Sequence, residues 1–210
     1  IPEWWPTGSR VAVAIAHDSS GDMNDPLIVR LHRELTERKF MTLRFNFPFA
    51  ETGKRASADS AETLERCYRS ALAIFGRDPS AAPAHLFLGG KGLGAGVAAR
   101  LSAAQLQIDG AFLLGFPLHP QDRPEKTQPE SLYRIVSPLL FVQGSRDRRC
   151  NLDKLRQCIS RVGAPTSLHV VEDADQTLRV PKKYGRDEES VESEITHTVA
   201  SWMENRLRGR

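Results

Sequence analysis

The chain has 210 residues, of which 40% are hydrophobic and 26% are charged, as in ordinary globular proteins with one buried core. Its formal net charge of +3 is too small to indicate a nucleic acid partner, and its longest apolar runs are too short to cross a bilayer. We therefore expect one domain over residues 1–210, with residues 1–8 as an N-terminal extension.

Six short apolar runs alternate with amphipathic stretches along the chain. Most of these runs are continuous rather than alternating, which is typical of parallel strands that are covered on both faces. The predicted strands span residues 11–16, 40–45, 84–88, 110–114, 138–142 and 167–171.

Between the predicted strands, apolar residues recur at spacings of three and four. This pattern indicates helices around residues 28–35, 64–75, 97–101, 152–159 and 191–202, the first of them begun by Asp25 and Pro26. The alternating order predicts an α/β fold, with a doubly wound and mostly parallel sheet of about six strands and helices on both faces.

One connection, residues 116–137, is long and rich in proline. Because it follows the carboxyl end of a strand, we expect it to lie near the functional site.

Residues 89–94, Gly-Gly-Lys-Gly-Leu-Gly, join a predicted strand to a helix, and three interpretations compete for them. A dinucleotide-binding fingerprint would use Gly90, Gly92 and Ala95, but it follows the first strand and needs an acidic residue at the end of the next one. Here the turn follows the third strand, and Asp109 stands at the start of the next. A nucleophile elbow would place Gly92 where the attacking serine stands. The third interpretation is a glycine turn without chemistry.

Other segments lie where the remaining parts of a hydrolase would be. Residues 17–24 follow the first strand, 144–147 the fifth and 172–176 the sixth, which gives the order nucleophile, acid and base of an α/β-hydrolase. From about residue 11 to residue 202 the chain resembles the small, lid-less bacterial α/β-hydrolases of the dienelactone-hydrolase-like group. The motifs that carry the resemblance are His-Asp-Ser-Ser-Gly-Asp-Met-Asn (17–24), Arg-Phe-Asn-Phe-Pro-Phe (44–49), Gly-Gly-Lys-Gly-Leu-Gly (89–94), Gly-Phe-Pro-Leu-His-Pro (115–120), Gln-Gly-Ser-Arg-Asp (143–147) and Asp-Ala-Asp-Gln-Thr (173–177).

The resemblance implies a catalytic triad, and of its three members only the acid, Asp147, carries over. Gly92 stands in the position of the serine, Gln176 in that of the histidine, and Asp18 in that of an oxyanion-loop glycine. Glycine is no nucleophile, glutamine is no base near neutral pH, and a carboxylate repels a developing oxyanion. We therefore expect little or no serine esterase activity. The residues that the group would use around its oxyanion site and pocket are His17, Asp18, Ser19, Asn46, Lys91, Leu93 and His119.

Three functions stay open. The first is a degenerate hydrolase, or pseudoenzyme, that keeps its pocket and binds a small carbonyl-containing ligand or a protein partner. The second is an ester or lactone hydrolase whose triad was removed by deliberate substitution. The third is a hydrolase that works with water or a metal. No cofactor is expected, but in the third case Asp18, Asp147 and Asp175, with Asp22 and Asn24 close in sequence, would surround a divalent cation.

Single residues outside these motifs carry weaker signals. His119, on the long connection, is interpreted either as a pocket residue or as a surface histidine, and Ser19 as a hydrogen-bonding residue of its loop. The three cysteines show no Cys-x-x-Cys pair and no metal-ligand spacing, and Cys150 is expected to be buried and inert. An odd number of cysteines without a disulfide framework indicates a reducing compartment, and the sequence shows no secretory leader, so a cytoplasmic location is expected.

Overall fold

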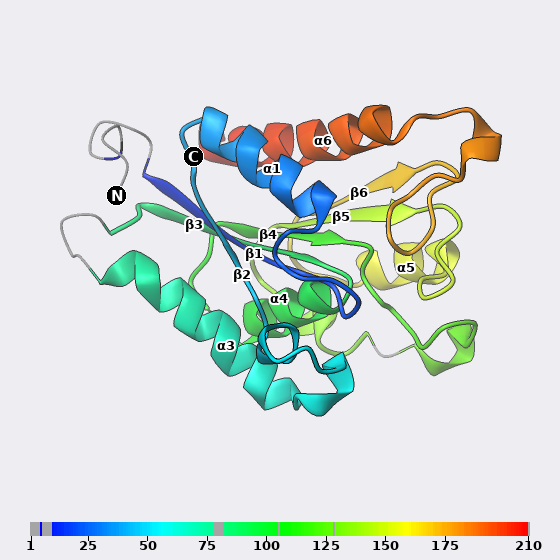
Figure 1. Ribbon diagram of the computed structural model, residues 1–210, viewed down its shortest axis with the longest axis horizontal. Coiled ribbons are helices and arrows are strands. Elements are labelled where there is room, and N and C mark those ends of the chain that lie inside the picture. Colours follow the sequence, from blue (N-terminus) through cyan, green and yellow to red (C-terminus); the bar gives the residue numbers. More distant parts are fainter. Residues whose placement is uncertain (1–4, 6–9, 78–81, 105, 128, 210) are drawn as a thin grey trace.

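A computed structural model describes residue 5 and residues 10–77, 82–104, 106–127 and 129–209. Its six strands form one sheet in the order β2-β1-β3-β4-β5-β6, and every neighbouring pair is parallel (Figure 1). The strands are β1 (Val11–Ala16), β2 (Met41–Phe45), β3 (His85–Lys91), β4 (Gly110–Leu114), β5 (Leu139–Gly144) and β6 (Thr166–Val171). The α-helices are α1 (Pro26–Glu37), α2 (Pro48–Glu51), α3 (Ala61–Ala73), α4 (Leu93–Ala103), α5 (Leu152–Ile159) and α6 (Glu188–Arg208).

All six predicted strands and all five predicted helices are confirmed, and among the strands the largest boundary error lies in β3. The sequence predicts that this strand ends at residue 88, whereas it continues to Lys91. Glycines weaken a strand signal because they have no side chain to pack. In the structure Gly89 and Gly90 nevertheless pair with Phe112 and Leu113 of β4. The extension carries the glycine-rich turn to the carboxyl edge of the sheet.

Each face of the sheet buries its own hydrophobic core. Because side chains alternate along a strand, Ala12, Ala14 and Ala16 of β1 point to one core, and Val11, Val13 and Ile15 point to the other. Figure 1 shows α1 and α6 on one face of the sheet and α3 and α4 on the opposite face. Residues of α5 pack into the same core as α3 and α4.

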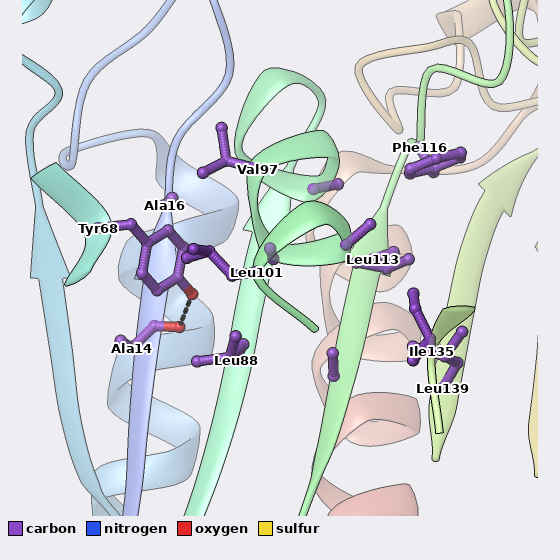
Figure 2. Close-up of a cluster of buried hydrophobic side chains, with 14 of the residues drawn as sticks. Ala14, Ala16, Tyr68, Leu88, Val97, Leu101, Leu113, Phe116, Ile135 and Leu139 are labelled. Carbon is purple, nitrogen blue, oxygen red and sulfur yellow. Dashed lines mark hydrogen bonds between the residues drawn. The ribbon is translucent and has the colours of Figure 1, made fainter. Parts of the chain in front are cut away.

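A buried tyrosine fixes α3 against the centre of the sheet. The Tyr68 hydroxyl donates a hydrogen bond of 2.7 Å to the Ala14 carbonyl oxygen of β1 and accepts the Gly89 N–H of β3 at 3.1 Å. The first of these bonds is drawn in Figure 2. Burial raises the pKa of this phenol, so it stays protonated. The two strands that carry the loops of the candidate site are therefore tied to one helix.

The long connection between β4 and β5 is more ordered than its polar, proline-rich sequence suggests. It contains the short 3-10 helices η5 (Pro124–Lys126) and η6 (Leu132–Arg134), and Leu132 and Ile135 are fully buried in the core beside α4. Three further 3-10 helices are η2 (Ala56–Ala58), η3 (Ile74–Gly76) and η7 (Lys182–Tyr184).

Two other expectations concern the ends of the chain and the membrane. Of the expected extension, residues 1–8, only Trp5 belongs to the described part, and its side chain is buried in the core shared with α3 and α4; the other seven residues lie outside it. Within the described ranges, no helix has both the length and the apolar character that a membrane span requires.

Candidate active site

The turn from β3 into α4 is a tight, strained strand-to-helix junction. Gly92, between the two elements, has φ +51° and ψ −113°, a conformation that side-chain-bearing residues rarely adopt. A Cβ on Gly90 would lie 2.2 Å from the Gly94 carbonyl carbon, and one on Gly94 would lie 2.5 Å from the Ala16 carbonyl oxygen. The glycines on both sides of position 92 are therefore needed for the close approach of α4 to the sheet, which is the geometry of a nucleophile elbow.

Asp109 provides a check on the competing nucleotide-binding interpretation. Its carboxylate lies at the amino end of β4, where it accepts the Leu86 N–H at 2.8 Å and contacts His85 Nδ1 at 3.0 Å. This is the edge of the sheet opposite to the glycine turn. An acidic partner for a ribose would have to lie at the carboxyl edge, so Asp109 does not take that role.

The side chain of Asp18 fills the space beside Gly92. A Cβ added to Gly92 would lie 2.0 Å from Asp18 Oδ1 and 2.1 Å from Asp18 Cγ. The place where an elbow residue would begin its side chain is thus occupied by a carboxylate from the loop after β1. The resemblance places Asp18 in the oxyanion loop, and the structure adds that its carboxylate reaches the space beside Gly92.

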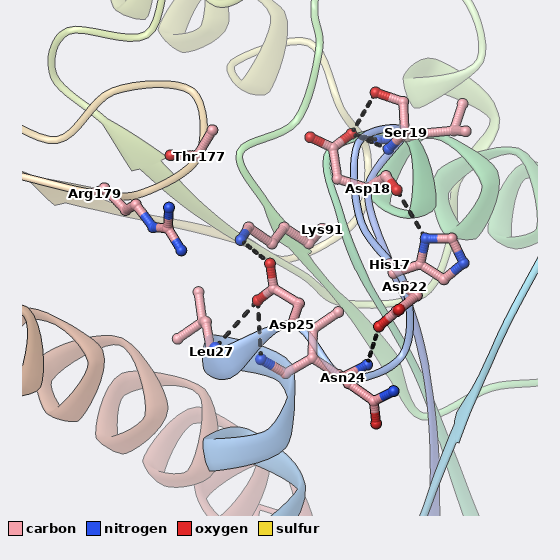
Figure 3. A network of polar contacts seen from close by, with 12 residues as sticks. His17, Asp18, Ser19, Asp22, Asn24, Asp25, Leu27, Lys91, Thr177 and Arg179 are labelled. Atoms are coloured by element: carbon pink, nitrogen blue, oxygen red, sulfur yellow. Dashed lines mark hydrogen bonds and ion pairs between the residues drawn. The ribbon is translucent and has the colours of Figure 1, made fainter. Parts of the chain in front are cut away.

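Four contacts hold the Asp18 carboxylate in this place. Its Oδ1 atom accepts the Leu93 N–H at 2.8 Å, the Ser19 N–H at 2.7 Å and the Ser19 hydroxyl at 3.2 Å, and the contacts between Asp18 and Ser19 are visible in Figure 3. Its Oδ2 atom lies 3.3 Å from a guanidinium nitrogen of Arg149. The Leu93 N–H belongs to the first turn of α4, where the helix dipole stabilises negative charge. The residue is only 6% exposed.

His17 precedes Asp18 and is held by both ring nitrogens. Its Nε2 atom accepts the Phe47 N–H at 3.0 Å, and its Nδ1 atom lies 2.7 Å from the Asp18 carbonyl oxygen. Since a carbonyl oxygen can only accept, Nδ1 carries the proton and the ring is neutral. Burial is the main cause that lowers the pKa of His17. With its one basic nitrogen occupied, His17 supports the loop and is not free to take a proton from a substrate.

Asn46 also supports the loop after β1. Its side-chain oxygen accepts the Met23 N–H at 2.7 Å, and its side-chain nitrogen donates to Glu51 at 2.8 Å. Arg44 donates to the Met23 carbonyl oxygen at 2.7 Å. The two residues from the Arg-Phe-Asn motif thus hold the backbone of Met23, in the loop after β1, from the side of β2.

Asp147, the expected acid, lies in the loop after β5. Its Oδ1 atom accepts the Arg149 N–H at 2.6 Å, and its Oδ2 atom accepts an N–H of the Gln143 side chain. Burial is the main cause that raises the pKa of its carboxyl group. Asp147 and Asp18 therefore contact the same residue, Arg149. Asp147 accepts the backbone N–H of Arg149, and Asp18 contacts its guanidinium group.

Gln176, in the expected base position, lies in a loop that packs directly on two glycines. A Cβ on Gly115 would lie 2.7 Å from the Gln176 carbonyl oxygen, and one on Gly144 would lie 2.4 Å from that of Ala174. The loop is thus pressed against the ends of β4 and β5. Within the described residues, the Gln176 side chain makes no hydrogen bond, and in particular none to Asp147.

His119 is buried, so the interpretation as a surface histidine is wrong. Its Nε2 atom accepts the Asn151 N–H at 2.9 Å, and its Nδ1 atom lies 2.8 Å from the Pro120 carbonyl oxygen. The ring therefore joins the long connection to the loop before α5. Cys150, which precedes Asn151 in sequence, is buried as expected, and burial raises the pKa of its thiol.

The three carboxylates proposed for a metal do not gather. Asp18 and Asp147 have the separate partners described above, and Asp175 accepts the N–H groups of Thr177 and Arg179 within its own loop. In the part of the chain that the structure describes, no three His, Cys, Asp or Glu side chains are arranged to hold a metal ion. The expected gathering of these carboxylates is therefore wrong.

Lys91 directs its side chain away from Gly92. Its Nζ atom forms an ion pair with Asp25 Oδ2 at 2.6 Å, while Asp25 Oδ1 caps α1 by accepting the N–H groups of Leu27 and Ile28 (Figure 3). The Lys91 side chain is only 6% exposed. It borders a cavity of about 660 Å³ between the amino ends of α1 and α6 and the loop after β6.

Sequence reasoning missed two features of this region, the contact of Arg149 with Asp18 and the ion pair between Asp25 and Lys91. Asp25 was assigned only as a cap. A lysine next to a buried strand end needs a counter-ion, and that requirement is the signal that could have suggested the pair. Nothing in the sequence singles out Arg149 among the basic residues of its loop.

Comparisons with known proteins agree with the fold. The family model described as "Alpha/beta hydrolase domain" matches residues 9–204. Similar solved structures include an alpha-beta serine hydrolase homologue from Coxiella burnetii, with 17% identity, a TM-score of 0.71, and coverage of 91% of this chain and 84% of that one. A dienelactone hydrolase from Anabaena variabilis has 15% identity, a TM-score of 0.73, and coverage of 95% and 88%. A monoacylglycerol lipase from Paleococcus ferrophilus has 13% identity, a TM-score of 0.74, and coverage of 94% and 95%. The chain belongs to the alpha/beta hydrolase family.

Proposed function

We propose that this chain is a non-hydrolytic α/β-hydrolase, a pseudoenzyme that acts by binding a small ligand. The observation that carries the proposal is the Asp18 carboxylate, which occupies the position of a side chain at residue 92 and accepts the N–H of Leu93. An acyl-transfer site needs that N–H for the developing oxyanion. Here the Asp18 side chain already accepts it.

The neighbouring groups do not supply the missing chemistry. Position 92 is glycine and position 176 is glutamine, so neither a hydroxyl nucleophile nor a base stands there. The nearby His17 is neutral with its basic nitrogen occupied by the Phe47 N–H. We therefore assign Asp18 the role of an internal anion that closes the former reaction centre.

The ligand position that fits this role lies on the other side of Lys91. A carbonyl-containing ligand bound as in a hydrolase would need the N–H groups of Leu93 and Ser19, which Asp18 holds. The cavity of about 660 Å³ beside Lys91 needs neither of them, and its volume is in the range of ordinary small-molecule sites.

Hydrolysis assays on the unmodified chain test the proposal. We expect no release of p-nitrophenol from p-nitrophenyl esters and no opening of simple lactones above the buffer rate, with or without EDTA. Hydrolysis above buffer would overturn the proposal, and its loss with EDTA would identify a metal-assisted reaction instead.

Restoration of the triad sharpens this test. In the variant with Asp18→Gly, Gly92→Ser and Gln176→His we expect ester hydrolysis at least about 100-fold above the unmodified chain, since a base positioned at a nucleophile contributes about 10²–10⁴. The matched control carries only Gly92→Ser and Gln176→His. It is expected to stay inactive, because Asp18 still occupies the space of the new serine.

A further inference from the structure

The cavity beside Lys91 is lined by two kinds of surface. Its apolar surface is formed by side chains from α1, the loop after β6 and α6, namely Pro26, Leu27, Leu178, Val180, Pro181 and Val191. Charged side chains surround this surface. A ligand that fills the cavity therefore needs a short apolar body and at least one polar or charged group.

The charges around the cavity are not balanced once their ion pairs are assigned. Lys91 pairs with Asp25 at 2.6 Å, and Arg179 contacts Glu188 at 3.4 Å. A third basic residue of the lining, Arg186, pairs with Glu194, which does not line the cavity. These three basic groups are thus already paired, and the fourth basic residue of the lining, Lys182, is exposed to solvent and forms no ion pair among the described residues.

Glu192 is the partly buried carboxylate of the lining that accepts no hydrogen bond from the described residues. Its side chain is 17% exposed, and the nearest cation is Arg30 at 3.7 Å, beyond hydrogen-bonding distance. Among the described residues it has no hydrogen-bond partner. A carboxylate removed this far from water costs free energy unless a cation approaches it.

We propose that this cavity binds a small organic cation, a primary ammonium group on a short apolar body, with the ammonium paired to Glu192. The ammonium would supply the hydrogen-bond donors that Glu192 lacks, and the apolar body would cover Leu27, Val180 and Val191. This inference rests on the proposed binding role and names the ligand class, but it does not depend on the loss of hydrolysis.

An anionic ligand fits the same cavity poorly. Lys91, the most buried cation of the lining, is held by Asp25, so an anion approaching Lys91 would also meet that carboxylate. Glu188 and Glu192 lie on the α6 side, and Glu188 is among the groups that raise the pKa of Glu192. Because like charges repel, the carboxylates of Glu188 and Glu192 disfavour an anionic ligand between them.

Calorimetric titration with three ligands of the same ring size tests the proposal. Benzylamine, which is protonated at neutral pH, carries the cation; benzyl alcohol is its neutral analogue and benzoate its anionic one. On the unmodified chain we expect benzylamine to bind at least tenfold more tightly than either analogue. Equal or tighter binding of benzoate or benzyl alcohol, or no binding of any of the three, would overturn the proposal.

Two variants then locate the site. Glu192→Gln is expected to weaken benzylamine binding at least tenfold, whereas Glu189→Gln is expected to leave it unchanged. Glu189 is a matched control, because it lies on the same helix and also contacts Arg30 at 3.7 Å, but it is 82% exposed and does not line the cavity. Unchanged affinity in the Glu192 variant would contradict the assignment, and the three-ligand ranking stands as a separate test should that variant fail to fold.

The outcomes separate this inference from the proposed function. Ester hydrolysis by the unmodified chain would overturn the non-hydrolytic role and leave the ligand ranking untouched. Silence toward all three ligands would overturn the cation site and leave the hydrolysis result untouched.

Discussion

Two consecutive residues of one turn, Lys91 and Gly92, lie in opposite environments. Beside Gly92 the space is filled, because the Asp18 carboxylate lies 2.0 Å from where a Cβ would be and holds the first N–H of α4. Beside Lys91 the space is open, and the lysine borders a cavity of about 660 Å³. The backbone geometry of an elbow is thus compatible with a carboxylate from another loop in the space beside its central residue.

Gly92→Ser is the change that should break the closed side most severely. The new side chain would have to adopt φ +51° and would overlap Asp18, so we expect the free energy of unfolding to fall by about 3–5 kcal/mol. Urea denaturation followed by circular dichroism measures this loss.

A double-mutant cycle with Asp18→Gly tells whether Asp18 is the cause. If the two side chains compete for one space, the double variant is more stable than the sum of the single effects by at least about 1 kcal/mol. Additive effects would mean that backbone strain alone accounts for the loss at position 92.

Asp18→Ala should be the next largest perturbation. It leaves the N–H groups of Leu93 and Ser19 and the Arg149 guanidinium without their carboxylate, and we expect a cost of about 2–4 kcal/mol in unfolding free energy. Asp18→Asn is the matched control, since its carbonyl oxygen can still accept both backbone N–H groups. Equal losses in the two variants would assign the stabilisation to the charge near Arg149 rather than to the backbone contacts.

The fold was readable from the sequence because its signals are local and repeated. Continuous apolar runs such as residues 11–16, spaced apolar residues such as Ile28, Leu31 and Leu35, and the Asp25 cap each indicate one element without reference to the others. The end of β3 was missed because Gly89 and Gly90 carry no such signal and gain their strand conformation from pairing with β4. The end of β3 is therefore set by tertiary contacts and not by the local sequence pattern.

The site was only partly readable, because its decisive contacts join distant loops. Motif order places Asp18, Gly92, Asp147 and Gln176 near one edge of the sheet, but it gives neither the direction of a side chain nor its partners. The Asp18 carboxylate lies beside Gly92, and Arg149 contacts that carboxylate. Both contacts depend on the relative positions of three loops. The surface interpretation of His119 failed for the same reason. The connection that carries it is largely polar in sequence, but its ring is buried and accepts the N–H of Asn151, a residue of another loop.

On the open side, removal of the Lys91 charge should cost somewhat less. Lys91→Met leaves the Asp25 carboxylate without its cation, yet Asp25 still caps α1, so we expect a loss of about 2–3 kcal/mol in unfolding free energy. Adding Asp25→Asn, which keeps a capping oxygen, should restore part of that loss. Asp153→Asn, which removes an exposed ion pair with Arg156, is the control for which no measurable change is expected. No recovery in the double variant would mean that Lys91 stabilises by packing rather than by charge.

The smallest effect concerns pH and the neutral ring of His17 beneath the closed side. Protonation would give Nε2 a hydrogen directed at the Phe47 N–H, and burial already lowers the pKa of His17 below the usual value of about 6.5. Between that lowered pKa and 6.5 the unfolded chain binds more protons than the folded chain, so stability is lost as pH falls, by at most about 1.4 kcal/mol per pH unit.

Urea denaturation from pH 5 to pH 7 measures how the free energy of unfolding changes with pH. The slope should be smaller in His17→Gln and unchanged in His197→Gln, whose histidine is exposed. His32, whose pKa is also lowered by burial, is present in both variants and cancels in the comparison. Equal slopes in the two variants would mean that His17 can be protonated in the folded chain, and the loop holding Asp18 would then be less firmly closed than its contacts indicate.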